Sequence, residues 1–227
     1  RGYFSWRAPR DRPRSPAVTL AVRTGKLDER QALELFASLG IPTAESQMAR
    51  APEFSHTLPY PVAAKILAAD VVHKTESGGV ILGIAGRSEF DEKVRGMGAP
   101  QVLVQKMESG VAEAIVGYRD DPLVGPVVLV GAGGVLAEIY KDYALRLAPV
   151  NEAEASAMIA EVKGLRLICG YRNLPKGDLE ALARAVVAIS RLALVPGRPV
   201  AEAEINPLIV KRDGAVAVDG LVTLKGA

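Results

Sequence analysis

One lysine lies within a run of residues that predicts a buried strand. Residues 61–67 read Pro-Val-Ala-Ala-Lys-Ile-Leu, and Lys65 is the only charged residue among them. Lysine is almost never fully buried without a partner, so a rigid strand here could hold a cation toward phosphate oxygens. The alternative is a lysine at a strand edge whose side chain reaches solvent, and this segment taken alone favours that alternative.

A histidine and a pair of glycines follow that strand. Residues 72–80 read Val-His-Lys-Thr-Glu-Ser-Gly-Gly-Val. The backbone N–H groups around Gly78 and Gly79 could approach a phosphate, because glycine lets the backbone come close. His73 is mostly neutral at pH 7, and a neutral imidazole can attack phosphorus. A solvated polar turn is an equally good interpretation of this segment, and His56 is expected in a surface loop.

A second glycine-rich segment follows a later strand. Residues 130–135 read Val-Gly-Ala-Gly-Gly-Val, which includes Gly133 and Gly134. The glycine spacing and the missing lysine exclude both the dinucleotide fingerprint and the Walker phosphate loop. A tight turn is an equally good interpretation. The charged residues that come next, such as Asp142 and Arg146, would form an ordinary solvated face if no ligand lay nearby.

Three oxygen-bearing side chains near the C-terminus could hold a divalent cation. Glu204 and Asn206 are two residues apart, so they point to the same face of an extended strand. Asp219 returns on the neighbouring strand after a predicted hairpin. Carboxylate and amide oxygens together with phosphate oxygens are the ligands that Mg²⁺ takes. A polar sheet face is the alternative, and the surrounding apolar residues at 215–218 weaken it.

The pattern of apolar residues predicts the elements that position these groups. Helices are expected to begin after the capping residues Asp28, Asn151 and Asp178, where apolar residues recur at three-to-four spacing. Strands are expected over 61–67, 79–84, 101–105, 112–116 and 125–130, and paired strands over 203–224 with a turn at 212–214. Groups of strands and helices without a regular alternation indicate an α+β fold.

Composition excludes several classes of protein. The 227 residues carry a formal net charge of +2 and 49% hydrophobic residues, as in ordinary globular chains. Cys169 is the only cysteine, which excludes an intrachain disulfide and a cysteine-cluster zinc site. No apolar run approaches about 20 residues and no cleavable signal is visible, so we expect a cytoplasmic protein with no membrane partner.

The first residues are basic, whereas the rest of the chain is mildly acidic. Five arginines and one aspartate give +4 over residues 1–14, which leaves −2 for the remainder. Such a tail could bind nucleic acid. It is short and rich in proline, so we interpret residues 1–27 as a linker from a preceding domain and expect no nucleic-acid partner.

Taken in this order, the segments resemble the ATP-grasp module of the NDP-forming acyl-CoA synthetases, which are relatives of the succinyl-CoA synthetase beta chain. The resemblance covers residues 28–224 and is strongest over 73–80, 130–150, 204–210 and 217–219. It implies an ATP-grasp fold in which two α+β subdomains clasp a nucleotide. A small lid subdomain is expected over 58–120, and a larger one over 121–227 together with the N-terminal helix. Two stretches, near 50–60 and 84–101, are shorter than is usual in this family, so either the lid is trimmed or residues are missing from the given sequence there.

The resemblance also implies a role for each candidate residue. Lys65 corresponds to the strand lysine that contacts nucleotide phosphates, and His73 to the histidine that carries the phosphoryl group. Asn206 and Asp219 correspond to the Mg²⁺ ligands, with Glu204 as a weaker third. The remaining nucleotide contacts are expected from Val104 and Gln105 at adenine, Glu113 at the ribose or metal, Gly78, Gly79, Gly133 and Gly134 around the phosphates, and Arg146 at a phosphate.

The activity implied for the whole enzyme is acid + CoA + ATP ⇌ acyl-CoA + ADP + phosphate, through a phosphohistidine. Mg²⁺ and ATP or ADP are the expected cofactors, and the CoA-binding and ligase domains of the same or a partner chain are the expected partners. The chain by itself is expected to bind nucleotide without making acyl-CoA. The alternatives are a catalytically inactive regulatory module, as in fusions to acetyltransferases, and an interaction protein whose nucleotide pocket has degenerated.

Overall fold

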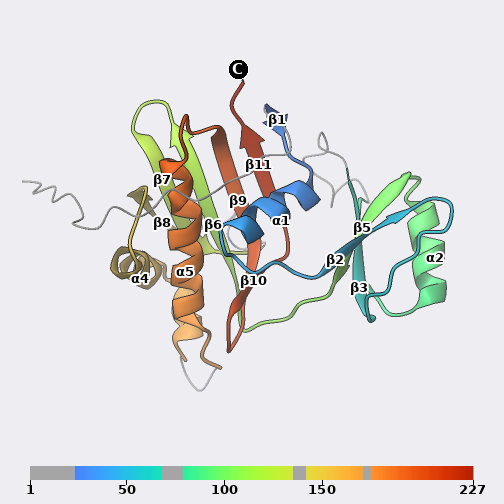
Figure 1. The fold of residues 1–227 in the computed structure, drawn as a ribbon. Helices are drawn as coiled ribbons and strands as arrows, with labels where there is room; N and C mark the ends of the chain where they lie inside the picture. The colour runs from blue at the N-terminus through green and yellow to red at the C-terminus, as the bar shows by residue number, and fades with distance from the viewer. Residues whose placement is uncertain (1–23, 68–78, 135–141, 171–174, 227) are drawn as a thin grey trace, which may run out of the picture.

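A computed structural model of the chain describes residues 24–67, 79–134, 142–170 and 175–226. These residues form two separate β-sheets with helices packed against them (Figure 1). Every pair of neighbouring strands within the two sheets is antiparallel. Antiparallel sheets with separate helices confirm the predicted α+β class.

The larger sheet has seven strands in the order β1-β11-β9-β6-β7-β8, and β10 pairs with β9 beside β11. Its strands are β1 (Gly25–Lys26), β6 (Ala112–Asp121), β7 (Gly125–Ala132), β8 (Tyr143–Leu147), β9 (Val200–Val210), β10 (Ala215–Ala217) and β11 (Gly220–Leu224). The smaller sheet has the order β2-β5-β3-β4. Its strands are β2 (Ser46–Arg50), β3 (Val62–Ile66), β4 (Val80–Ile84) and β5 (Gln101–Lys106).

The described residues form four α-helices, of which those that follow Asp28, Asn151 and Asp178 begin where the sequence predicts them. They are α1 (Glu29–Ser38), α2 (Arg87–Gly96), α4 (Glu152–Glu161) and α5 (Leu179–Ser190), with short 3₁₀ turns η1 (Gly164–Cys169) and η3 (Arg191–Leu194). Asp28 and Asn151 each form a capping box with the residue three positions later, and Asp178 caps α5. These caps satisfy backbone N–H groups that would otherwise lack partners. No helix among the described residues is long and apolar enough to cross a membrane.

Each sheet has its own helical cover. Helices α4 and α5 lie across one face of the larger sheet (Figure 1), where Leu182, Val186 and Ile189 of α5 are fully buried. Helix α2 packs on the smaller sheet through Phe90 and Val94, both fully buried. The opposite face of the smaller sheet is turned toward α1 and the larger sheet, since Leu103 of β5 joins the larger hydrophobic core. The face of the smaller sheet that carries Leu103 therefore lies against α1 and the larger sheet.

The division of the chain differs from the lid boundaries expected at 58–120. The smaller sheet begins at Ser46 and ends at Lys106, whereas β6 lies at the centre of the larger sheet between β9 and β7. The sequence of β6 alternates like any half-buried strand, so only its pairing partners decide to which sheet it belongs. Four strands or α-helices, β1, β2, β8 and α2, lie where the sequence predicted none. Helix α2 buries only two apolar side chains, and Tyr143, Leu145 and Leu147 of β8 are exposed.

Candidate functional site

Lys65 lies at the junction of the two sheets and is 4% exposed. Its Nζ atom donates hydrogen bonds to Oε1 of Glu29, at 2.6 Å, and to the carbonyl oxygen of Val218, at 2.7 Å. The nearest Asp219 carboxylate oxygen, Oδ2, is 3.9 Å from the same nitrogen. The solvent-exposed edge lysine favoured by the segment alone is therefore wrong, because β3 lies inside the sheet and its ammonium is buried.

The alternation of β3 explains this placement. Val62 and Ala64 point into the smaller core beneath α2, so Ala63 and Lys65 point to the opposite face. Lys65 is paired with Leu103, which reaches the larger core. The side chain of Lys65 therefore extends from β3 to contact α1 and the segment that joins β10 to β11.

Asn206 and Asp219 are brought together as the sequence predicts. Ile205 is paired with Gly220 and Leu208 with Ala217, so Asn206 lies directly opposite Asp219. Asp219 accepts a hydrogen bond at Oδ1 from the N–H of Gly220 at 2.7 Å, which leaves Oδ2 on the side of Lys65. Among the described residues, the buried Oδ1 atom of Asn206 has no hydrogen-bond partner. An unpaired buried amide oxygen beside a carboxylate fits a magnesium ligand set.

Glu204, the third oxygen-bearing residue of the predicted metal site, shares a face of β9 with Asn206. It is paired with Gly117 and Leu221 across the sheet, and Ala203 and Ile205 on either side of it are buried in the core. In the part of the chain that the structure describes, no three His, Cys, Asp or Glu side chains are grouped to hold a metal ion. Phosphate oxygens would therefore have to supply most of the ligands, as is usual for Mg²⁺.

The glycine-rich turn after β7 lies against the start of β6. The N–H of Gly133 donates to the carbonyl of Glu113 at 2.8 Å, and a Cβ atom at Gly133 would lie 2.7 Å from the backbone carbonyl carbon of Ala114. Gly134 has φ +73°, and a Cβ there would lie 2.4 Å from Oε2 of Glu113. Only glycine fits at either position. The turn thus lies beside the Glu113 carboxylate, on the sheet face that also carries Glu204.

Gln105 and Val104 are adjacent in β5 but point to opposite faces. Gln105 is 2% exposed, and its side chain is on the same face as Lys65. Its Nε2 atom has no hydrogen-bond partner within the part of the chain that the structure describes. Val104 packs in the smaller core. The backbone of β5 is paired with β2 on one side and β3 on the other. Gln105 is therefore the member of this pair whose side chain faces the junction of the sheets.

Arg146 is separated from the other candidates. It is opposite Val128, whose side chain is in the core beneath α4 and α5, and its guanidinium forms an ion pair with Glu161 of α4. Asn206 lies on the other face of the sheet, three strands away, which is roughly 14 Å at the usual strand spacing. The structure thus places Arg146 away from the predicted phosphates, because a side chain of β8 that contacts α4 cannot reach the opposite face.

Some predicted residues lie outside the described residues, and others have roles that the sequence did not indicate. His73, Lys74 and Gly78 are outside the described ranges; Gly79 is buried, and its carbonyl accepts a hydrogen bond from Ile66 at 2.8 Å. Asp142, expected on a solvated face, accepts hydrogen bonds from the N–H groups of Lys163 and Gly164. His56 is half-buried, not on the surface, with its ring 4.6 Å from that of Phe90.

Glu29 is the residue at this junction that sequence reasoning missed. It is 3% exposed, and it is the first residue of α1 after the capping Asp28. An acidic residue in the first turn of a helix is ordinary, since it complements the helix dipole. The sequence therefore held no signal that this carboxylate would be buried against a lysine on a distant strand.

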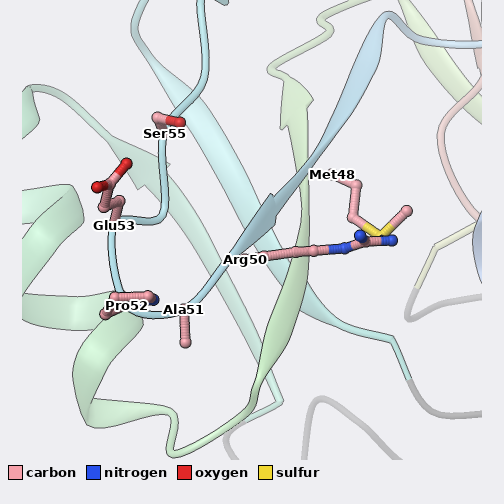
Figure 2. A pocket seen from close by; sticks show the side chains of 6 residues that line it. All are labelled: Met48, Arg50, Ala51, Pro52, Glu53 and Ser55. Atoms are coloured by element: carbon pink, nitrogen blue, oxygen red, sulfur yellow. The ribbon is translucent and has the colours of Figure 1, made fainter.

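A hollow elsewhere on the smaller sheet contains none of these groups. It has a volume of about 390 Å³ and lies at the end of β2 and the loop after it (Figure 2). Its lining residues are Met48, Arg50, Ala51, Pro52, Glu53 and Ser55. Figure 2 shows Arg50 extended toward Met48, while Glu53 and Ser55 project from the loop. This hollow lacks the lysine, amide and carboxylate of the junction and is not the candidate site.

The chain is similar to known proteins over most of its length. Residues 19–224 match the ATP-grasp domain family. The chain is 35% identical to the beta subunit of acetate–CoA ligase [ADP-forming] I of Pyrococcus furiosus, over 87% of this chain and 91% of that one. It is 34% identical to acetate–CoA ligase [ADP-forming] I of Archaeoglobus fulgidus over 86% of this chain, but spans only 30% of that longer relative.

Solved structures agree with these relatives. Acetyl-coenzyme A synthetase 1 of Ca. Korarchaeum cryptofilum, in complex with coenzyme A and Ca-AMPCP, matches with a TM-score of 0.83 and 31% identity, over 88% of this chain and 94% of that one. The same enzyme with Mg-AMPPCP, its phosphohistidine segment pointing towards the nucleotide binding site, matches with a TM-score of 0.79 and 34% identity, over 88% and 93% of the two chains. The expected ATP-grasp fold is therefore confirmed. The chain belongs to the ATP-grasp domain family, in the branch that contains the beta subunits of ADP-forming acetate–CoA ligases.

Proposed function

We propose that this chain is the nucleotide-binding, phosphoryl-transferring part of an acid–CoA ligase that catalyses acid + CoA + ATP ⇌ acyl-CoA + ADP + phosphate. The observation that carries the proposal is the buried Oδ1 atom of Asn206, which has no hydrogen-bond partner in the described ranges and lies opposite Asp219, beside the buried ammonium of Lys65. A buried polar atom without a partner costs stability, so its retention points to a ligand. The relatives supply the class of ligand, since one of them is solved with Mg-AMPPCP.

Each residue has a defined part in this proposal. Asn206 and Oδ2 of Asp219 would hold Mg²⁺, which when bound neutralises charge on the phosphates. Lys65 has three N–H donors, and the bonds to Glu29 and Val218 use two of them. Within the described ranges the third has no acceptor at hydrogen-bond distance, and it would face a phosphate oxygen on the side of Asp219. Gln105, which faces the junction from β5, would contact the base. Glu113 would contact the ribose or the metal ion, and Gly133 and Gly134 would lie around the phosphates.

His73 is the proposed carrier of the phosphoryl group. A nitrogen of its neutral imidazole would attack the terminal phosphorus of ATP, so that a P–N bond forms while the bond to the ADP oxygen breaks. Catalysis of this step rests mainly on positioning and on stabilising charge, which is the part assigned to Lys65. His73, Gly78 and the flanking residues lie outside the described ranges, so their roles rest on the resemblance and on the phosphohistidine segment of the relative.

The complete reaction needs further domains. The chain spans about 30% of the length of its single-chain relatives but 91% of separate beta subunits. We therefore propose CoA-binding and ligase domains, in the same or a partner chain, as its partners, and the cytoplasm as its location. With Mg-ATP, CoA and short carboxylic acids, the isolated chain is expected to form no thioester. The named relatives are ligases, which gives no support to the regulatory alternative.

Calorimetric titration with Mg-ADP tests the proposal. The wild-type chain should bind saturably, and Asp219→Asn and Asn206→Ala should each weaken binding by at least tenfold. Asp213→Asn is the matched control, because Asp213 is an exposed acid in the turn between β9 and β10 and should leave the Kd unchanged. Absence of saturable binding to the wild-type chain would overturn the proposal.

A second experiment addresses the phosphoryl carrier. Incubation with Mg-ATP labelled in its γ-phosphate should label the protein in a form that is stable to base and labile to acid, as expected for phosphohistidine. His73→Asn should abolish the label, whereas His56→Asn should retain it. A regulatory module without transfer activity would bind nucleotide and take up no label.

A further inference from the structure

We infer that Glu29 is a positioning residue that holds the Lys65 ammonium away from Asp219 and so keeps that carboxylate available to a metal ion. This inference rests on the proposed function, because it concerns the same nucleotide site. Nothing in the resemblance or in the comparisons assigns a role to Glu29. The evidence is the arrangement of three charges around one buried nitrogen atom.

The distances show which carboxylate holds the lysine. Nζ of Lys65 is 2.6 Å from Oε1 of Glu29, within hydrogen-bond distance, but 3.9 Å from Oδ2 of Asp219, beyond it. The side chains of Lys65 and Glu29 are 5% and 2% exposed, whereas that of Asp219 is 44% exposed. The buried charge is thus neutralised by the buried carboxylate. The exposed carboxylate stays separate on the side of Asn206.

Other hydrogen bonds of these residues also favour the pairing of Lys65 with Glu29 and not with Asp219. Glu29 is fixed by its place in the first turn of α1, behind the Asp28 cap. A second hydrogen bond, from Lys65 to the carbonyl of Val218 at 2.7 Å, holds the ammonium beside Asp219 without using its carboxylate. Asp219 in turn places Oδ1 on the N–H of Gly220. The two carboxylates therefore have different tasks.

Removal of the Glu29 charge would change which carboxylate pairs with the Lys65 ammonium. The Asp219 carboxylate lies within 4 Å of the ammonium, and the flexible four-carbon stem of lysine would let the ammonium move to it. A direct ion pair between Lys65 and Asp219 would compete with a divalent cation for the same oxygen. The cation would then need a higher concentration to bind, and at saturating Mg²⁺ it would displace the ammonium from Asp219 and restore the contact of Lys65 with the nucleotide.

Mg²⁺ titrations at fixed ADP concentration, followed by calorimetry, test this competition. Glu29→Gln preserves the size of the side chain and removes its charge. We expect it to raise the Mg²⁺ concentration for half-saturation at least fivefold, while the ADP Kd at saturating Mg²⁺ stays within twofold of wild type. Glu34→Gln is the matched control, because Glu34 is an exposed acid on the same helix, paired with Arg30. It should leave both values unchanged.

The split between the two values separates positioning from a merely structural role. A general distortion of the site would weaken ADP binding at every Mg²⁺ concentration, and that result would overturn the inference, as would a Glu29→Gln variant identical to Glu34→Gln. Should Glu29→Gln fail to fold, Glu29→Asp retains the charge on a side chain shorter by one methylene and should give a smaller rise in the Mg²⁺ requirement. Failure of the wild-type chain to bind Mg-ADP would instead refute the proposed function on which the inference rests.

Discussion

Asn206 of β9 lies opposite Asp219 in the segment between β10 and β11, and the buried amide oxygen of Asn206 has no hydrogen-bond partner in the described part of the chain. Cross-strand neighbours in an antiparallel pair are close enough for their side chains to share a ligand. This relationship is the structural basis of the proposed Mg–nucleotide site, because β9 and the β10–β11 segment alone bring the two side chains together.

Asn206→Leu should separate stability from binding. Leucine is similar in size to asparagine and removes the unpaired buried oxygen, so we expect the free energy of unfolding to stay the same or rise. Mg²⁺-dependent binding of ADP should be lost, since an oxygen ligand is gone. Urea unfolding and calorimetry measure the two effects. A fall in stability of more than about 1 kcal/mol would show that the amide makes a structural hydrogen bond instead.

Lys65→Met should destabilise the fold as well as weaken nucleotide binding. It leaves the Glu29 carboxylate buried without its lysine partner, and breaking a buried ion pair in this way costs about 3–5 kcal/mol. The double variant Lys65→Met/Glu29→Gln removes both charges and should recover much of the loss. Chemical denaturation of the three proteins checks this order. For comparison, Lys93→Met removes an exposed pair with Glu89 and should cost less than about 1 kcal/mol.

Gly220→Ala should disturb the segment that carries Asp219. A Cβ atom at Gly220 would lie 2.3 Å from Cε2 of Phe36 in the core, so either the ring or the strand must move. Overpacking of this kind costs about 1–3 kcal/mol, and we expect weaker Mg-ADP binding because Asp219 is adjacent. Gly96→Ala is the control: it is the last residue of α2 with open space around it, and its thermal midpoint should not fall. Equal midpoints for the two variants would contradict the prediction.

The stability of the smaller sheet should decrease on mild acidification. Burial, with a smaller contribution from the charge of Arg87, lowers the pKa of His56 below its usual value of 6.5. The unfolded chain therefore binds a proton more readily than the folded chain, and stability falls as the pH drops below 6.5. Unfolding in urea between pH 7.5 and 5.0 should show a steeper loss for wild type than for His56→Gln. Parallel curves would mean that His56 does not contribute.

Local patterns in the sequence determined most of the elements and the placement of Asn206 opposite Asp219. Asp28 and Asn151 identify helix starts by themselves, because a capping box involves residues only three positions apart. The alternation around Glu204 and Asn206, followed by a tight turn, likewise predicts that Asp219 returns beside them. These features depend on backbone periodicity and on contacts between near neighbours, which the order of residues contains.

Only the tertiary structure decided which faces and which distant residues meet. Arg146 lies on the helix-covered face of the larger sheet with Glu161, and Lys65 is neutralised by Glu29 from a helix at the start of the described chain. Such pairings depend on strand order and on the packing of two sheets against α1, and no local pattern encodes them. The sequence therefore identified Lys65 and Arg146 as candidate residues, and the packing of the sheets and helices determined which carboxylate each of them contacts.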